Sequence, residues 1–270
     1  MRLDLHLHST ASDGSLSPSA LVWAARAGGL DVIALADHDT CAGVVDAQRT
    51  LSAQLHVIPA IELSTTLDGS ELHVLGYFID PTHPAILDYS ATAAQKRRDR
   101  ICGMLTRLEP YGVRLTLDEV LAAAERETLM IGRPHLARAL AQRGYVQTVA
   151  EAFDRFIGDQ GPAFLPTDLL STRDGIDLIK RTGGVAIWAH PRWSAVEKHL
   201  SSLIAWNLDG IECYRPTAPA AEVAQLERTV KARGLLATGG SDWHGSWQGR
   251  LGDFYVGPDE VEPFLERGGM

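Results

Sequence analysis

Short apolar runs alternate with helical segments along most of this chain. One such segment begins at Ser17 and Pro18 and ends at Gly28 and Gly29, residue types that favour the two ends of a helix. Strands alternating with helices at this spacing are typical of a parallel sheet, so we expect an α/β fold built as a parallel barrel, distorted or short of eight strands. The predicted strands cover residues 3–8, 31–36, 56–63, 71–79, 185–189, 210–214 and 235–238.

The alternation is interrupted once. Residues 84–166 have a mostly helical pattern, and Thr116 and Glu119 within them have the spacing of a capping box, in which each side chain bonds the backbone of the other residue. We therefore predict that residues 1–83 and 167–270 form the two parts of the barrel, with residues 84–166 as a helical insertion, or cap domain, between them.

Composition narrows the range of functions. The chain has 34 acidic and 25 basic side chains and a net charge of −9, which argues against a broad basic surface for duplex DNA. No apolar run approaches the roughly 18 residues of a membrane helix, and the N-terminus lacks a signal-peptide pattern. Cys41, Cys102 and Cys213 lie far apart and are odd in number, as in a reducing compartment. We expect a cytoplasmic protein that binds neither duplex DNA nor a membrane.

The 10 histidines are unevenly distributed, and six lie at or beside the C-terminal ends of predicted strands. His6 and His8 are two residues apart on the first strand, so their side chains project from the same face. In a parallel barrel these strand ends meet at one rim, where active sites are built. Together with nearby carboxylates, the candidate metal ligands are His6, His8, Asp13, His38, Glu62, His73, His190, Asp242 and His244.

A single histidine at a strand end is most often an ordinary hydrogen-bonded residue. A buried set of imidazoles and carboxylates is different, because each unpaired polar group costs roughly 1–3 kcal/mol. Divalent cations remove this cost, and mixed nitrogen and oxygen donors suit zinc, manganese or iron better than magnesium or calcium. The candidates suffice for two or three ions if Glu62 bridges a pair. Such ions activate water and neutralise phosphate charge, as phosphoester hydrolysis requires.

The same residues fall in motifs that resemble one known family, the polymerase and histidinol phosphatase (PHP) family. The resemblance covers the chain on both sides of the insertion. It rests on HLHS at residues 6–9, ADHDT at 36–40, Glu62, ELH at 71–73, AHP at 189–191 and GSDWH at 240–244.

This resemblance implies a distorted (β/α)7 TIM-like barrel with two or three divalent ions, manganese foremost, with zinc or iron as alternatives. It further implies which residues bind each ion of a trinuclear site. By this resemblance one ion is held by His6, His8, Glu62 and Asp242, a second by Glu62, His73 and His190, and the third by Asp13, His38 and His244.

The insertion carries a motif of its own, Gly132, Arg133, Pro134 and His135. Taken alone, it fits the ordinary start of a helix with a solvated arginine equally well. Within the PHP family it resembles the subgroup that acts on nucleoside 3′,5′-bisphosphates and 5′-phosphorylated oligonucleotides. An arginine beside a helix N-terminus is suited to bind phosphate, and Arg192, after the AHP motif, is a second candidate.

We therefore expect Arg133 and Arg192 to bind anionic oxygens of the substrate and His135 to assist the leaving group. Ser9 is a further candidate for substrate binding from the first loop.

Other residues near the predicted rim have weaker signals. Arg97 and Arg98 fit a solvated helix face, and Glu212 and Tyr214 at a strand end either support the ligands or contact the substrate. Four tryptophans near the rim suit packing, or stacking on a base: Trp188, Trp193, Trp243 and Trp247.

We expect a metal-dependent phosphoric ester hydrolase that removes the 3′-phosphate of nucleoside 3′,5′-bisphosphates and degrades short oligonucleotides from the 5′ end. Its partners are then small phosphorylated nucleotides. Histidinol phosphatase is the alternative within the family, although the motif in the insertion argues against it. An amidohydrolase and a non-catalytic metal-binding PHP module are alternatives of other kinds, and the complete ligand set argues against the module. The sequence leaves open the metal, the base preference and the oligomeric state.

Overall fold

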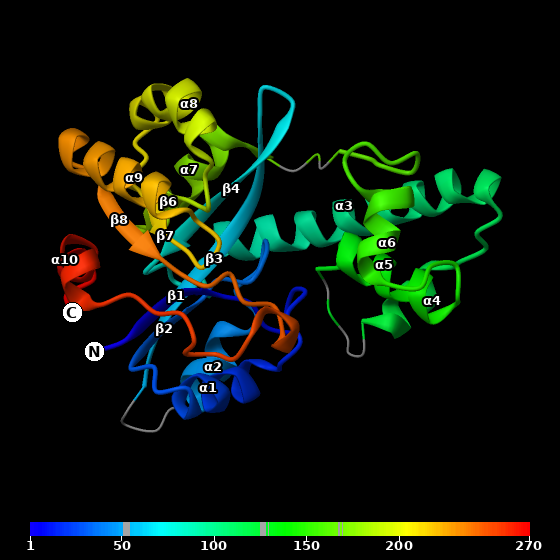
Figure 1. The fold of residues 1–270 in the computed structure, drawn as a ribbon, viewed down its shortest axis with the longest axis horizontal. Helices are drawn as coiled ribbons and strands as arrows, with labels where there is room; N and C mark the ends of the chain where they lie inside the picture. Colours follow the sequence, from blue (N-terminus) through cyan, green and yellow to red (C-terminus); the bar gives the residue numbers. More distant parts are fainter. Residues whose placement is uncertain (51–54, 125–127, 129, 167, 169) are drawn as a thin grey trace.

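A single mixed sheet organises the molecule (Figure 1). The computed structural model describes residues 1–50, 55–124, 128, 130–166, 168 and 170–270. Its strands follow the order β1-β2-β3-β4-β6-β7-β8, and β5 pairs with β3 outside this path. The strands are β1 (Leu3–Leu7), β2 (Val32–Leu35), β3 (His56–Leu67), β4 (Ser70–Tyr77), β5 (Leu170–Ser171), β6 (Val185–Trp188), β7 (Gly210–Tyr214) and β8 (Leu236–Gly239).

Helices cover the sheet from several sides. In Figure 1, α1 and α2 lie below the sheet, α7, α8 and α9 lie above it, and α3 to α6 extend to the right. Within the described residues no helix is both long and apolar enough to cross a membrane. The helices are α1 (Pro18–Ala27), α2 (Val44–Arg49), α3 (Pro84–Leu108), α4 (Leu117–Ala123), α5 (Arg133–Gln142), α6 (Val149–Ala152), α7 (Thr172–Arg181), α8 (Trp193–Ala205), α9 (Ala220–Arg233) and α10 (Pro258–Arg267).

Both faces of the sheet are buried, which explains why its strands are apolar almost throughout. One face packs on itself and on α10, where the ring of Phe264 meets that of Tyr77 edge to face with centroids 4.9 Å apart. The opposite face, with Ile33, Ile61 and Ile211, packs against the surrounding helices. The expected α/β fold is therefore confirmed. A single bridge between Leu7 and Trp243 links the first strand to the segment after the last strand.

The fourth strand departs from the expected parallel pattern. β4 pairs antiparallel with both β3 and β6, so the prediction of an all-parallel sheet is wrong for this strand. Asp68 and Gly69 join β3 to β4 with φ of 50° and 79°. An Asp-Gly pair with positive φ forms the tight turn of a β-hairpin, and this signal stands in the sequence between the two apolar runs.

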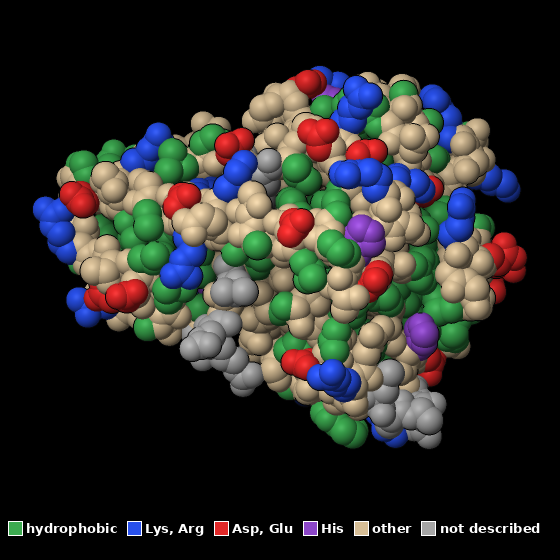
Figure 2. All heavy atoms as spheres, turned by 180° about the vertical axis from the view of Figure 1, so that it is seen from behind, with side chains coloured by type: hydrophobic (Ala, Val, Ile, Leu, Met, Phe, Trp, Pro, Cys, Tyr) green, Lys and Arg blue, Asp and Glu red, His purple; other side chains and the backbone are tan. Residues whose placement is uncertain are grey.

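The insertion contains helices α3 to α6 and has an apolar cluster of its own, which includes Ile101, Met104, Leu136 and Ile157. Figure 2, seen from behind, shows it as a lobe at the left of the molecule. The insertion therefore packs around apolar residues of its own. Residue 167, where we expect the barrel to resume, lies outside the described residues.

Predicted helix ends are present where the cap chemistry indicated. The Ser17 side chain accepts a hydrogen bond from the Ala20 amide at the start of α1. At α4 the amide of Thr116 donates to Glu119 Oε2 at 2.8 Å and the amide of Glu119 donates to Thr116 Oγ1 at 3.3 Å, which completes the capping box.

Arg97 connects the insertion to the sheet. Its Nε donates to Asp39 Oδ2 at 2.8 Å, its Nη2 donates to Ser64 Oγ at 2.9 Å, and the hydroxyl of Tyr89 also donates to Asp39. Arg97 is 8% exposed and Asp39 is fully buried. The prediction of a solvated helix face is therefore wrong for Arg97, because its partner lies 58 residues earlier, in the loop after β2.

We predict that Arg97→Met lowers the free energy of unfolding by about 3–5 kcal/mol, because Asp39 then remains as a buried charge without its partner. Urea denaturation measures the change. The neighbouring Arg98→Met is the control, with an expected change within about 0.5 kcal/mol, as is usual for a surface substitution. An equally small effect of both substitutions would mean that the contact between Arg97 and Asp39 contributes little to stability.

Candidate metal centre

A fully buried carboxylate, Glu62 on β3, lies at the centre of the predicted ligands. Its two oxygens face different imidazoles, which is the arrangement of a carboxylate that bridges two cations. Oε2 lies 3.0–3.3 Å from ring nitrogens of His6, His8 and His38, and Oε1 lies 2.9–3.0 Å from ring nitrogens of His73 and His190.

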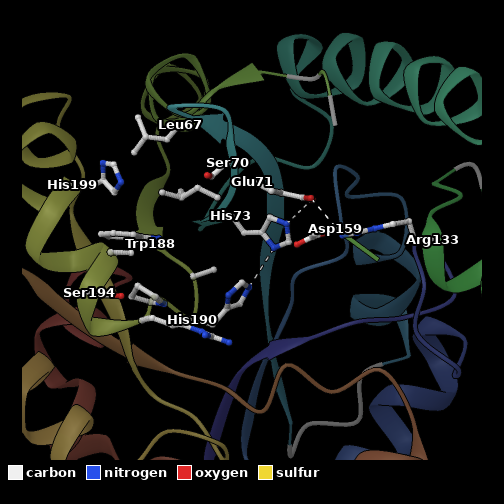
Figure 3. Close-up of a pocket in the computed structure, with 15 residues that line it drawn as sticks. Leu67, Ser70, Glu71, His73, Arg133, Asp159, Trp188, His190, Ser194 and His199 are labelled. Carbon is white, nitrogen blue, oxygen red and sulfur yellow. Dashed lines mark hydrogen bonds and ion pairs between the residues drawn. The ribbon is translucent and has the colours of Figure 1, made fainter. Parts of the chain in front are cut away.

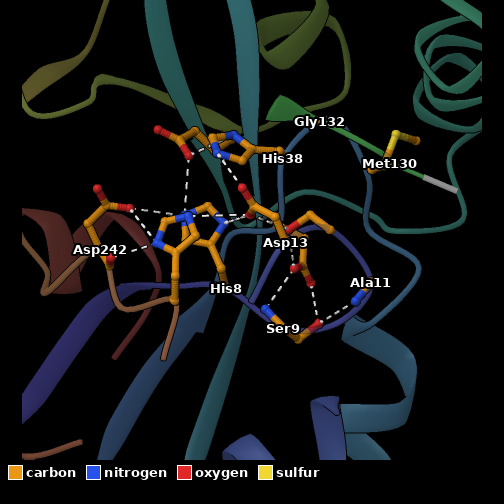
Figure 4. A network of polar contacts seen from close by, with 12 residues as sticks. His8, Ser9, Ala11, Asp13, His38, Met130, Gly132 and Asp242 are labelled. Atoms are coloured by element: carbon orange, nitrogen blue, oxygen red, sulfur yellow. Dashed lines mark hydrogen bonds and ion pairs between the residues drawn. The ribbon is translucent and has the colours of Figure 1, made fainter. Parts of the chain in front are cut away.

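The predicted ligands form three sets whose donor atoms lie within 4.8 Å of one another. The first matches a set that the family resemblance implies. In the second, His38 stands where the resemblance implies His190, whose Nε2 lies 3.0 Å from Glu62 Oε1 and 3.3 Å from His73 Nδ1. In the third, His8 joins the three implied residues, and Figure 4 shows His8, Asp13 and His38 turned toward the same space, with Asp242 beside them. The sets are His6, His8, Glu62 and Asp242; His38, Glu62 and His73; and His8, Asp13, His38 and His244.

The donor atoms fit divalent cations. Several of them are buried without a hydrogen-bond partner among the described residues: His6 Nε2, both ring nitrogens of His8, His38 Nδ1 and Glu62 Oε2. Each such atom costs roughly 1–3 kcal/mol when it stays unpaired, and coordination to a cation supplies the missing partner. The cluster of histidines and carboxylates is therefore able to bind metal.

Charge within the cluster favours anionic carboxylates. Burial alone raises the pKa of Glu62, but the imidazoles of His38 and His73 outweigh it and hold the pKa well below its usual range. Burial lowers the pKa of His38 to about 4, so this imidazole is neutral at pH 7. Burial also disfavours charge on His8, but Asp242 and Glu62 outweigh it and raise its pKa to about 10. A cation at His8 would therefore compete with a proton.

The direction of β4 explains how His73 reaches this rim. His73 is the fourth residue of β4 and pairs with Ser64 of β3. We expect ligands at strand C-termini, but His73 lies in the N-terminal half of a strand that runs against its neighbours. His73 reaches the other ligands because β4 runs antiparallel, which the parallel pattern did not predict.

Glu212 holds two ligands at once. Its Oε1 lies 2.9 Å from His6 Nδ1, and its Oε2 accepts a hydrogen bond from the His190 amide at 2.7 Å. Glu212 is 1% exposed, so it supports the ligands and does not reach the solvent. This contact decides between the two roles that the sequence left open for it.

Two further carboxylates, to which the sequence analysis assigned no role, hold the ligand loops in place. Asp37 accepts hydrogen bonds from the amide and hydroxyl of Ser9 and from the hydroxyl of Ser12, each at 2.7 Å. Asp4 accepts from the amide and hydroxyl of Ser241 at 2.8 and 2.6 Å. Asp37 belongs to the ADHDT motif, and Asp4 has the same parity on its strand as His6, so both signals were present.

Three residues of the ligand loops have left-handed backbone conformations. The φ angles are 57° at Asp39, 34° at His190 and 53° at Asp242. Such conformations cost roughly 1–3 kcal/mol in residues other than glycine and cluster at functional sites. Local backbone strain thus accompanies the orientation of these side chains.

A cavity of about 460 Å³ opens beside the cluster and is lined by His73, His190, Arg133 and Arg192, among others. Figure 3 shows Arg133 extending from the insertion toward His73 and Asp159. Arg133 Nη1 donates to Asp159 Oδ1 at 2.6 Å, and the side chain is 19% exposed. Arg192 is exposed at the opening and forms no ion pair within the described part of the chain.

His135 and Ser9 are less accessible than a substrate-binding role requires. His135 is 1% exposed, and its Nδ1 accepts a hydrogen bond from the Gly132 amide at 3.0 Å, so it caps the helix that carries Arg133. Ser9 is fully buried, and its hydroxyl donates to Asp37. The geometry gives no support to the catalytic role predicted for His135 or to substrate binding by Ser9.

The four tryptophans differ in exposure. Trp188 and Trp243 are buried, with 3% and 6% exposed, and Trp193 packs partly against the core. Trp247 is 66% exposed, so of these four it has the ring most available for stacking.

Comparison with known proteins gives consistent results. Residues 4–158 match the family described as PHP domain. A 5′-3′ exoribonuclease of Haemophilus influenzae is 35% identical over 90% of this chain and 90% of its own length. A 3′,5′-nucleoside bisphosphate phosphatase of Chromobacterium violaceum is 27% identical over 92% and 88%. A solved structure from Bifidobacterium adolescentis, to which metal-dependent phosphoesterase activity is ascribed, has a TM-score of 0.88 and 32% identity over 98% and 96% of the two chains.

We predict that Mn²⁺ or Zn²⁺ raises the Tm of chelator-treated protein by roughly 5–10 °C, because a ligand at about 100 times its Kd stabilises the folded state by about 2.7 kcal/mol. Glu62→Gln should remove most of this rise and lower the bound metal measured by elemental analysis. Glu109→Gln, at a side chain that is 61% exposed in the insertion, is the matched control. If neither cation changes the Tm of the wild-type protein, the metal centre is contradicted.

Proposed function

This chain belongs to the PHP domain family, and on that premise we propose that it hydrolyses phosphate esters of nucleotides. The preferred group is the 3′-phosphate of nucleoside 3′,5′-bisphosphates, and short 5′-phosphorylated oligonucleotides are further substrates. The chain is a metal-dependent phosphoesterase, as the relatives with this fold are hydrolases of phosphate esters.

One observation carries the proposal: the Glu62-centred cluster borders a cavity that also holds two guanidinium groups. Arg133 comes from the insertion and Arg192 from the loop after β6, so the two cations reach the cavity from different parts of the chain. Guanidinium groups bind phosphate oxygens in bidentate fashion. A phosphate ester therefore finds both a metal site and fixed positive charge in the same place.

We assign two or three divalent cations to the three ligand sets, with manganese as the first candidate and zinc or iron as alternatives, because the donors are mixed nitrogen and oxygen. When bound, the cations would neutralise charge on the phosphoryl oxygens and make water a stronger nucleophile. Glu62 would bridge neighbouring sites, and Glu212 would keep His6 and His190 oriented toward them.

The reaction is a hydrolysis at phosphorus. The oxygen of a water molecule forms a bond to phosphorus, the bond to the 3′-oxygen breaks, and that oxygen takes a proton. The products from a bisphosphate are a nucleoside 5′-phosphate and inorganic phosphate. Arg133 holds the 5′-phosphate of the departing nucleoside in this assignment, and Arg192 faces the phosphate that reacts.

The surface fits small substrates. On the face seen in Figure 2, basic and acidic side chains are interspersed, and the net charge is −9. This face therefore offers no broad basic area for a duplex backbone, which suits a mononucleotide or a short single strand better.

The decisive test compares substrates at equal metal loading. We predict release of inorganic phosphate from adenosine 3′,5′-bisphosphate with a kcat/KM roughly 10–100-fold above that for histidinol phosphate, since one guanidinium contact to a phosphate is worth roughly 1.5–3 kcal/mol. A preference for histidinol phosphate would assign the chain to the other activity, and no hydrolysis of either compound would favour a non-catalytic module.

Arg133→Ala should raise the KM for adenosine 3′,5′-bisphosphate roughly 10–100-fold, because a charge-assisted contact to the 5′-phosphate is lost. Metal content should not change, since Arg133 is no ligand. Arg155→Ala is the control, because Arg155 is also in the insertion but pairs with Glu151 and is 51% exposed. Unaltered kinetics for Arg133→Ala would show that the guanidinium does not hold the substrate.

A further inference from the structure

A second cavity, of about 650 Å³, also adjoins the metal centre and has His190 in its lining. It shares His190, Arg192 and Ser194 with the first cavity, so the two spaces meet at the loop after β6. Asp242 of the metal centre also lines it. Both cavities therefore border the metal centre, and together they have room for an extended substrate.

The second cavity contains a guanidinium with unused donor capacity. Arg215 follows β7; its Nη2 donates to Pro191 O at 2.9 Å and to Glu222 Oε1 at 2.8 Å. Its Nη1 is buried and has no hydrogen-bond partner among the described residues. Arg192 lies at the same opening and has no ion pair within the described part of the chain, so the cavity has two arginines beside two carboxylates, Glu222 and the metal-centre residue Asp242.

Backbone groups add to this field. Helices α8 and α9 both begin at the cavity, since Trp193 and Ser194 start α8 and Pro219 precedes α9. The N-terminus of a helix carries a partial positive charge and free amide donors, which favour phosphate. Arginines and helix ends thus favour the same anionic ligand.

The chemistry of the substrate says which part belongs there. In an oligonucleotide the first nucleoside departs through its 3′-oxygen, while the second nucleoside stays esterified to the phosphorus that reacts. With the 5′-phosphate of the first nucleoside at Arg133, the second nucleotide must extend past Arg192. The second cavity meets the first at Arg192 and so offers room for that nucleotide.

We propose that this cavity is a subsite for the second nucleotide of a single strand and that Arg215 binds the phosphate that follows it. The inference rests on the proposed function, because that function fixes the first nucleotide in the other cavity. A nucleoside bisphosphate leaves this subsite empty, whereas a trinucleotide fills it.

The test compares a 5′-phosphorylated triadenylate with adenosine 3′,5′-bisphosphate, both as substrates and, for the triadenylate, as a slowly hydrolysed phosphorothioate in equilibrium binding. Arg215→Gln should weaken triadenylate binding and lower its kcat/KM roughly tenfold or more, and change kcat/KM for the bisphosphate less than about threefold. Glu222→Gln is the matched variant with the opposite sign: it removes the carboxylate that competes for Arg215, so triadenylate binding should tighten roughly two- to fivefold.

Equal losses on both substrates in Arg215→Gln would overturn the subsite, because Arg215 would then only support Pro191. Unchanged triadenylate binding in both variants would overturn it as well. If the wild-type protein hydrolyses neither compound but binds the phosphorothioate through Arg215, the proposed function fails and the binding site stands. If the wild-type protein hydrolyses the bisphosphate but triadenylate binding does not depend on Arg215, the proposed function stands and the subsite fails.

Discussion

The buried charge of Glu62 constrains the rest of the structure. A buried charge needs partners, and imidazoles from the N-terminal strand, the loops after β2 and β6, and β4 surround both oxygens of Glu62. Oε2 forms no hydrogen bond among the described residues, so its partner would be a cation. The imidazoles are in turn held by Glu212 and by the strained loop at His190. The sheet brings these segments together because its strand ends converge around Glu62.

Much of this arrangement was predictable, and the failures have physical causes. The two-residue spacing of His6 and His8 placed both rings on one face, 5.1 Å apart between centroids. The antiparallel course of β4 does not follow from the apolar alternation, which is the same in either strand direction; the sequence signal for it is the Asp-Gly turn before β4. Arg97 was misjudged because its exposure depends on Asp39, a partner that helical periodicity cannot reveal.

The insertion contributes to the site in two ways. Through Arg97 it is anchored to the loop that follows β2, directly beside the ligand His38. Through the first residues of α5 it delivers Arg133 to the cavity, with His135 buried beneath as a cap. The insertion has its own apolar cluster, so its surface can change without disturbing the sheet. Arg133 therefore lies close to the metal ligands although it belongs to a separate segment of the chain.

The ligands extend from His6 to Asp242 and His244, so first and last strands meet only when nearly the whole chain is available. During synthesis on the ribosome, a nascent chain that has reached β6 already holds His6, Glu62 and His73 but lacks Asp242. By then the set of His38, Glu62 and His73 is complete, whereas the sets that include Asp242 or His244 are complete only after β8 has been made. Two of the three ligand sets therefore depend on contacts between the two ends of the chain, which are the contacts of longest sequence separation and the slowest to form.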